Sequence, residues 1–154
     1  MREILVSEYG KLKSIDTPIE GCWINITSPN SEDISFLKEM GFEEDFVYDS
    51  LDQEERARFE QDEDLVYIIT KLPYFDSEDK AVPYKTMTLG IAMKSGYFVT
   101  VSSFKSAILE DLIEGRVRDV STKKRNRFLL RIFERGTEYY LRYRKEIRRH
   151  SNEI

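Results

Sequence analysis

Short apolar runs alternate with helically spaced apolar positions along this chain, a pattern typical of a sheet covered by helices. The run at 65–72 is continuous, so we expect a strand that is buried on both faces of the sheet. Strict alternation at 85–93, a Lys-Ser-Gly turn and a second run at 97–101 predict a hairpin. The predicted strands are residues 4–6, 22–26, 56–61, 65–72, 85–93 and 97–101, with 56–61 as a polar edge strand.

Apolar residues spaced three or four positions apart predict four helices. Pro29 at the first helical position or Asn30 as the cap begins the first helix, and Gly41 is placed to end it. The other three cover about 43–51, 104–114 and 122–149, and no element is predicted at 9–21. The stripe of the long helix comprises Leu129, Ile132, Phe133, Tyr140, Tyr143 and Ile147. We therefore predict a three-layer α/β/α fold with a central mixed sheet, followed by a long C-terminal helix.

Charge is distributed unevenly over a chain whose 154 residues suit a single domain. The net charge is -5, but residues 1–120 carry -12 and residues 121–154 carry +7. Cys22 is the single cysteine, which excludes an internal disulfide and suits a reducing compartment. No run of about 18 apolar residues occurs, so we expect no membrane-spanning segment within these residues.

The residues that enzymes use for nucleophilic catalysis are scarce, and we expect no enzyme. The sole histidine, His150, lies in a basic tail, and Cys22 lies in a predicted strand where a small buried residue is usual. The sequence contains no nucleophile elbow, phosphate loop or dinucleotide-binding fingerprint. One cysteine and one histidine also do not make a soft-metal site within one chain.

Three acidic residues are spaced to share one face of the helix predicted at 43–51. Asp45, Asp49 and Asp52 stand at positions i, i+4 and i+7. Carboxylate oxygens suit hard cations, and Mg²⁺ often keeps several waters and binds only one or two carboxylates. From the residues alone, a solvated acidic surface is the alternative, and both interpretations stay open.

The basic C-terminal helix suggests a function of another class. Its arginines and lysines, with Tyr139 and Tyr143 between them, could meet phosphates. The acidic body and the absence of a nucleic-acid signature argue against nucleic acid as a partner. The remaining alternative is a binding module whose basic helix docks an acidic partner, RNA or a membrane surface.

Five short motifs occur in a characteristic order along the chain. They are Trp23-Ile24-Asn25, Met40-Gly41-Phe42, Tyr48-Asp49-Ser50-Leu51, Arg56-Ala57-Arg58-Phe59-Glu60 and the apolar strand at 65–70. The set resembles the N-terminal cytoplasmic domain of the CorA family of magnesium and cobalt channels. The hairpin at 87–101 and the long helix, with its Leu-Leu and Tyr-Tyr pairs, extend the resemblance over nearly the whole chain.

The resemblance implies a regulatory domain of a homopentameric Mg²⁺/Co²⁺ channel at the cytoplasmic face of the cell membrane. Regulatory Mg²⁺ would bind between identical subunits, with Asp49 as the ligand and Asp45 and Asp52 in support; Co²⁺ or Zn²⁺ are the other implied ions. The domain would comprise residues 1–120, and residues 121–154 would begin the long helix towards the membrane. The family's pore helices and Gly-Met-Asn signature are not among these residues. The zinc-transporting branch, which shares this domain, is the alternative.

The chain departs from the family pattern at two motifs. Ala57 stands where the family usually has proline between two basic residues, which affects only a strand entrance. Tyr48 precedes Asp49 where the family has glutamate, and Arg135 falls near the place of an inner-helix acid. Tyr48 and Arg135 argue against a second metal site, whereas Asp49 remains the candidate for the first.

Overall fold

One sheet and four helices make up residues 1–153, which the computed structural model describes. The strands are β1 (Arg2–Glu8), β2 (Lys11–Ile15), β3 (Cys22–Thr27), β4 (Arg58–Asp62), β5 (Leu65–Phe75), β6 (Tyr84–Lys94) and β7 (Tyr97–Ser102). The helices are α1 (Ser31–Glu39), α2 (Glu44–Leu51), α3 (Ala107–Ile113) and α4 (Arg125–Glu153). Within this range, no helix combines the length and the apolar character that crossing a bilayer requires.

The seven strands form a mixed sheet in the order β2-β1-β3-β7-β6-β5-β4. β3 and β7 run parallel, with Trp23 opposite Phe98, and the other neighbours are antiparallel. β4 lies at one edge, which confirms the predicted polar edge strand. β2 lies at the other edge and was not predicted, because Leu12 and Ile15 are its only apolar residues and do not alternate.

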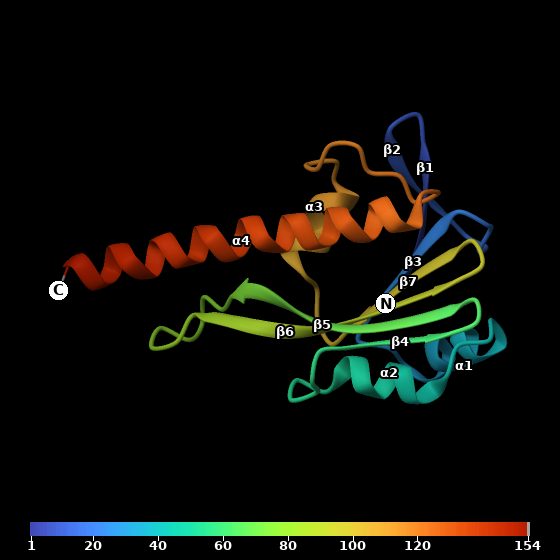
Figure 1. Ribbon diagram of the computed structural model, residues 1–154, viewed down its shortest axis with the longest axis horizontal. Coiled ribbons are helices and arrows are strands. Elements are labelled where there is room, and N and C mark those ends of the chain that lie inside the picture. Colours follow the sequence, from blue (N-terminus) through green and yellow to red (C-terminus); the bar gives the residue numbers. More distant parts are fainter. Residues whose placement is uncertain (154) are drawn as a thin grey trace.

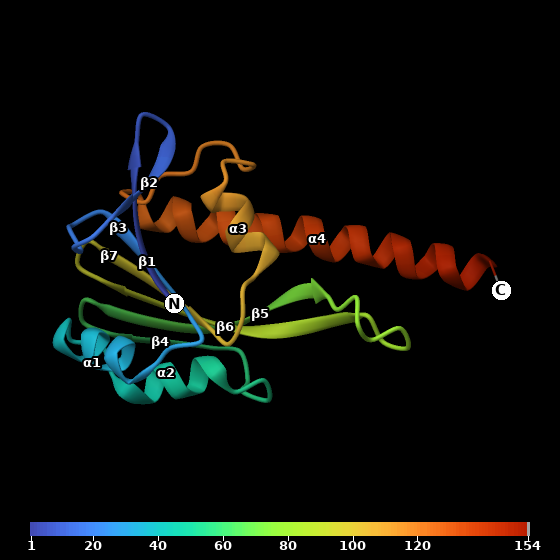
Figure 2. The ribbon, with the colours of Figure 1, turned by 180° about the vertical axis from the view of Figure 1, so that it is seen from behind.

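Helices cover both faces of the sheet, which confirms the predicted three layers (Figures 1 and 2). α1 and α2 pack on one face over a core that includes Ile24, Val99 and Phe46. α3 and α4 cover the other face over a second core around Trp23 and Phe128. Successive residues of the central strands therefore point into two different cores, as expected for a strand that is buried on both sides.

The ends of α1 follow the capping signals in the sequence. Asn30 is the N-cap, since its side-chain oxygen accepts a hydrogen bond from the Asp33 amide at 2.9 Å. Asp33 returns the contact by accepting from the Asn30 amide at 3.1 Å, which completes a capping box. Gly41 follows the helix with a φ of +93°, where residues with a side chain are strained.

Close contact between α2 and β6 fixes the position of the helix that carries the acidic residues. Phe46 stacks on Tyr67 of β5, with 4.7 Å between ring centroids. Ser50 is fully buried and lies directly over Gly90, where a Cβ atom would overlap the Ser50 hydroxyl. The buried hydroxyl donates to the Phe46 carbonyl at 2.7 Å, so the polar group is satisfied. Glycine at position 90 thus allows α2 to lie against the sheet.

α4 packs on the sheet through its first half and extends beyond the sheet at its C-terminal end (Figure 1). Phe128 is fully buried and makes edge contacts with Trp23 and Phe98, at centroid distances of 4.9 and 4.7 Å. The predicted stripe was wrong at Tyr140, which is 58% exposed, because the neighbouring Tyr139 points inward. It was also wrong at Ile147, which is 47% exposed. The predicted start of α3 was also early, since Ser106 caps the helix and Ala107 begins it.

Candidate functional site

The three candidate acidic residues lie along α2 and at its end. Asp45 is exposed in the first turn, where a negative charge suits the positive end of the helix dipole. Asp49 lies one turn later with about a third of its side chain exposed (34%). Asp52 is the C-cap residue and has an extended backbone, so it lies beyond the helix. The structure therefore places Asp45 and Asp49 on the helix and Asp52 outside it.

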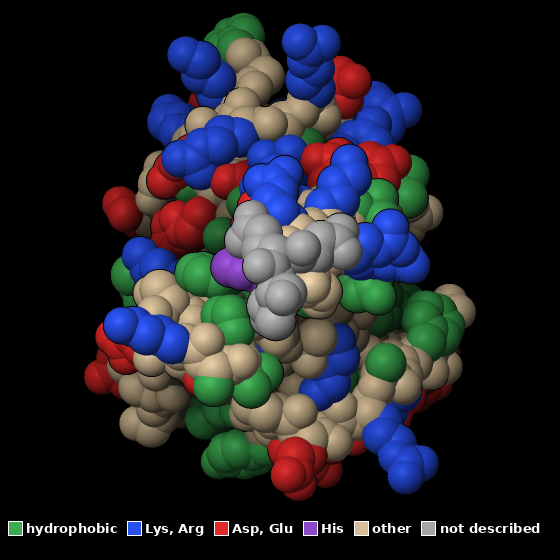
Figure 3. All heavy atoms as spheres, turned by 90° about the vertical axis from the view of Figure 1, so that its left-hand side faces the viewer, with side chains coloured by type: hydrophobic (Ala, Val, Ile, Leu, Met, Phe, Trp, Pro, Cys, Tyr) green, Lys and Arg blue, Asp and Glu red, His purple; other side chains and the backbone are tan. Residues whose placement is uncertain are grey.

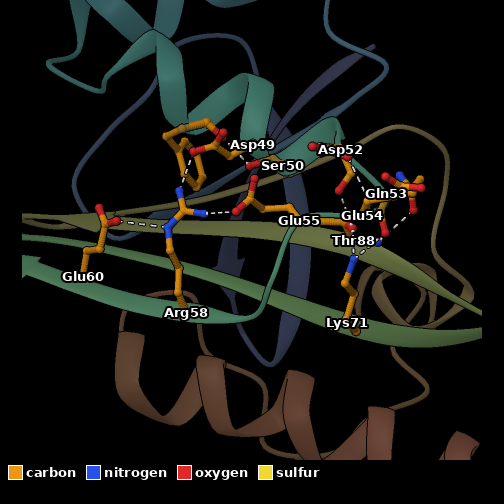
Figure 4. A network of polar contacts seen from close by, with 11 residues as sticks. Asp49, Ser50, Asp52, Gln53, Glu54, Glu55, Arg58, Glu60, Lys71 and Thr88 are labelled. Atoms are coloured by element: carbon orange, nitrogen blue, oxygen red, sulfur yellow. Dashed lines mark hydrogen bonds and ion pairs between the residues drawn. The ribbon is translucent and has the colours of Figure 1, made fainter.

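Arg58, at the start of the edge strand β4, pairs with Asp49 (Figure 4). Its Nη2 atom donates to Asp49 Oδ2. Nη1 donates to Glu55 Oε1 at 2.7 Å and Nε donates to Glu60 Oε1 at 3.0 Å. Partial burial disfavours the charged guanidinium, but hydrogen bonds to Asp49 and Glu60 outweigh that effect and raise the pKa of Arg58. One cation is shared by three carboxylates, which leaves the cluster with a net negative charge.

A second set of polar contacts holds the C-terminal end of α2 on the sheet (Figure 4). Thr88 of β6 donates its hydroxyl to the Asp52 carbonyl at 2.8 Å and its amide to Gln53 Oε1 at 3.1 Å. Lys71 of β5 donates to the Gln53 carbonyl at 2.7 Å and to Thr88 Oγ1 at 2.6 Å. The Lys71 ammonium near this helix end also complements the negative end of the dipole.

The acidic side chains near α2 are too few to enclose a bare divalent cation. Among residues 1–151, no group of three or more His, Cys, Asp or Glu side chains is arranged to hold a metal ion. A hydrated Mg²⁺ needs fewer, since one or two carboxylates suffice when the ion keeps its waters. The Asp49 carboxylate is occupied by the Arg58 guanidinium. Asp49 as a metal ligand therefore stays a prediction, and a hydrated ion would have to take the place of Arg58 there.

Comparison with known proteins decides the family. The sequence matches the family model described as CorA-like Mg2+ transporter protein over residues 20–154. The chain belongs to the CorA family. The cobalt/magnesium transport protein CorA of Methanocaldococcus jannaschii is 31% identical over 120 residues, which cover 77% of this chain and 34% of that protein. The chain therefore spans about a third of the length of this curated relative.

Solved structures of CorA-family proteins have the same fold. The soluble domain of CorA from M. jannaschii matches with a TM-score of 0.78 and 26% identity, over 99% of this chain and 62% of that chain. The complete CorA magnesium transporter of that organism gives 0.76 and 24% identity, over 99% and 49%. The ZntB cytoplasmic domain from Vibrio parahaemolyticus gives 0.74 and 18% identity, over 98% and 63%. This CorA-family chain therefore corresponds to the soluble domain of a transporter family.

Tyr48, which departs from the CorA pattern, lies on the exposed side of α2. Its side chain is 53% exposed, and its hydroxyl donates to Glu44 Oε1 at 3.1 Å. The hydrogen bond to the Glu44 carboxylate, with that group's negative charge, raises the pKa of Tyr48. A phenol therefore stands beside Asp49, in place of the second carboxylate that the resemblance implied.

The basic C-terminal half of α4 forms one wall of a groove at the end of the molecule. Figure 3 looks onto this end and shows Lys and Arg side chains around hydrophobic ones. The groove holds about 570 Å³ and lies between α4 and the β5–β6 hairpin, with Tyr84, Tyr143 and Arg144 in its wall. Tyr84 donates to Glu146 at 3.3 Å, which joins the hairpin to the helix. The groove is the surface that a basic binding module would use.

Sequence reasoning missed a buried acidic residue that joins α3 to α4. Asp111 is 4% exposed and accepts hydrogen bonds from the Tyr139 hydroxyl at 2.5 Å, Arg135 Nε at 3.0 Å and Arg116 Nη1 at 2.8 Å. Burial alone would raise the pKa of Asp111, but these three donors lower it below the usual value. An acid among the apolar residues of 108–113 was the available signal, because such an acid needs partners when it is buried.

Proposed function

We propose that this chain is the regulatory domain of a CorA-like Mg²⁺/Co²⁺ transporter that senses intracellular Mg²⁺ between identical subunits. The proposal rests on the CorA family match over residues 20–154. The likeness to a domain that was solved on its own as the soluble domain of CorA supports a role outside the pore. We place the domain at the cytoplasmic face of the membrane, in a pentamer. Residues 121–154 would lead towards the transmembrane part.

In the proposed mechanism, acidic residues of neighbouring subunits face each other near α2. Asp49 is the main ligand, Asp45 lies one helical turn before it, and Asp52 follows the helix end. A bound Mg²⁺ supplies positive charge that screens these carboxylates. Without that charge the carboxylates repel one another, so the subunits can shift to the open arrangement. The fastening of α2 by Thr88 and Lys71 would pass such a shift to the sheet.

The test is Asp49→Ala in the full-length transporter that contains this domain. We expect the variant to stay open at Mg²⁺ concentrations that close the wild-type channel, because one ligand per subunit is lost. Ion flux into liposomes at stepped internal Mg²⁺ measures closure. Asp16→Ala, an exposed acid at the end of β2, controls for the change in net charge. Unchanged closure in Asp49→Ala would remove Asp49 from the mechanism.

The zinc-transporting branch is the second candidate function. It is suggested by the fold shared with the ZntB cytoplasmic domain, and at 18% identity that likeness speaks only for the fold. The same liposome assay with Zn²⁺, Co²⁺ and Mg²⁺ separates the two candidates. Flux of Zn²⁺ without flux of Mg²⁺ would favour the zinc branch.

A further inference from the structure

Arg58 is bound more completely than a surface arginine usually is. Nitrogen atoms Nε, Nη1 and Nη2 each contact a different carboxylate, those of Glu60, Glu55 and Asp49. The side chain is 31% exposed, so solvent screens these pairs only in part. Three carboxylates from α2, the following loop and β4 thus converge on one guanidinium.

The neighbouring basic residue shows that this arrangement is specific to position 58. Arg56 lies two residues earlier, is exposed, and forms no ion pair with any side chain of residues 1–151. Both arginines carry the same charge close to the same acidic helix. Only Arg58 occupies the Asp49 carboxylate, so a change at Arg56 alters the net charge without altering that contact.

The three pairs mean that Asp49 can leave Arg58 without leaving the guanidinium unpaired. If Asp49 turned to another cation, Arg58 would keep Glu55 at 2.7 Å and Glu60 at 3.0 Å and would not be left unpaired. An unpaired, partly buried charge is what makes a broken ion pair costly. Exchange at Asp49 avoids that cost.

We propose that Arg58 is a tethered cation that neutralises Asp49 when no divalent ion is bound, and that it thereby sets the Mg²⁺ concentration at which Asp49 takes up an ion. Both cations need the same carboxylate, and the guanidinium repels a divalent ion held nearby. The inference rests on the proposed function, because it takes Asp49 as the ligand of the ion. It adds a regulatory element that lies within one chain.

The experiment measures the Mg²⁺ concentration that closes the full-length transporter containing this domain, by ion flux into liposomes at stepped internal Mg²⁺, because the subunits that would share the ion are assembled there. Arg58→Gln is expected to close at an Mg²⁺ concentration up to about five-fold lower than the wild type needs, the largest change that a partly exposed ion pair provides. Arg56→Gln, which removes the same charge, is the matched control and is expected to shift the closing concentration less. Arg58→Gln/Asp49→Asn is expected to lose the shift.

The outcomes separate this inference from its alternatives. Equal shifts in Arg58→Gln and Arg56→Gln would reduce the effect to net charge and overturn the inference. An unchanged closing concentration in Arg58→Gln would overturn it as well. Arg58→Lys keeps the charge and tests the same contact if the glutamine variant unfolds. Its Mg²⁺ response is expected to lie between those of Arg58→Gln and the wild type. Unchanged closure in the Asp49→Ala channel would remove the proposed function and this inference with it. Altered closure in Asp49→Ala, together with an unchanged closing concentration in Arg58→Gln, would overturn this inference alone.

Discussion

Gly90 decides how closely α2 approaches the sheet. Ser50 and Phe46 of the helix lie directly over the glycine, and a Cβ atom there would overlap the Ser50 hydroxyl and lie 3.0 Å from the Phe46 ring. The acidic residues of α2 are therefore held at a height over the sheet that depends on one missing methyl group.

We predict that Gly90→Ala lowers the free energy of unfolding by about 1–3 kcal/mol, the usual cost of overpacking a core. Urea unfolding followed by circular dichroism measures it. Gly136→Ala in α4 is the comparison, because its Cβ atom would meet only the ends of the Leu72 and Ile108 side chains, at 3.3 and 4.0 Å. Alanine also suits a helix interior better than glycine, so a loss at Gly136 as large as at Gly90 would contradict this account.

The sequence predicts the elements better than it predicts the direction and the partners of individual side chains. The period of α4 was clear, but the pattern could not distinguish Tyr139 from Tyr140, because both are aromatic and adjacent. The buried hydrogen bond from Tyr139 to Asp111 settles which one points inward. The pairing of Asp49 with Arg58 was equally hidden, since it depends on where β4 returns beside α2.

At the scale of elements, α3 and α4 are joined by a buried ion cluster as well as by apolar packing. Asp111 of α3 accepts hydrogen bonds from Arg135 and Tyr139 of α4 and from Arg116 of the intervening loop. The packing of α4 against α3 therefore depends on the ionised state of one carboxyl group.

We predict that Asp111→Asn lowers the free energy of unfolding by about 2–3 kcal/mol at pH 7, because two arginines lose a buried partner. The pKa of Asp111 is lowered in the folded state. Its contribution is therefore complete above the unfolded value of about 3.9 and disappears as the pH falls through the folded pKa. The difference between wild type and variant should shrink in acid, as urea unfolding from pH 7 to pH 3 would show. Glu110→Gln, on the same helix, is the control, and a difference that stays constant with pH would contradict the prediction.

Most elements could be predicted because each carries its own local signal. The cap at Asn30, the alternation in β6 and the continuous run of β5 depend on neighbours in the sequence. β2 carries no such signal, because its place in the sheet depends on pairing with β1, so it was missed. The metal site stays a prediction, because a ligand shared between subunits depends on a second chain.

The uneven charge of the whole molecule follows its architecture. Residues 1–120, which form the sheet and the first three helices, carry a net charge of -12, and residues 121–154, most of which form α4, carry +7. The C-terminal end of α4 extends past the sheet (Figure 1). A long helix whose charge is opposite to that of its own domain presents a positive electrostatic potential. That potential attracts an acidic surface of a neighbouring molecule.

The parallel pairing of β3 with β7 has a consequence for how the chain acquires its structure. Trp23 and Phe98 are neighbours in the sheet but lie 75 positions apart in the sequence. A ribosome that adds about 5–20 residues per second needs roughly 4–15 s to make that stretch. During this interval the β1–β3 segment has no partner for its inner edge, whereas β5 and β6 can pair as soon as they emerge. We predict that pulsed hydrogen exchange during refolding protects β5 and β6 amides before those of β3, since local contacts close first. Simultaneous protection would contradict this order. The seam between β3 and β7 is then the last part of the sheet to form, and β3 is the strand most open to wrong partners while the protein is being made.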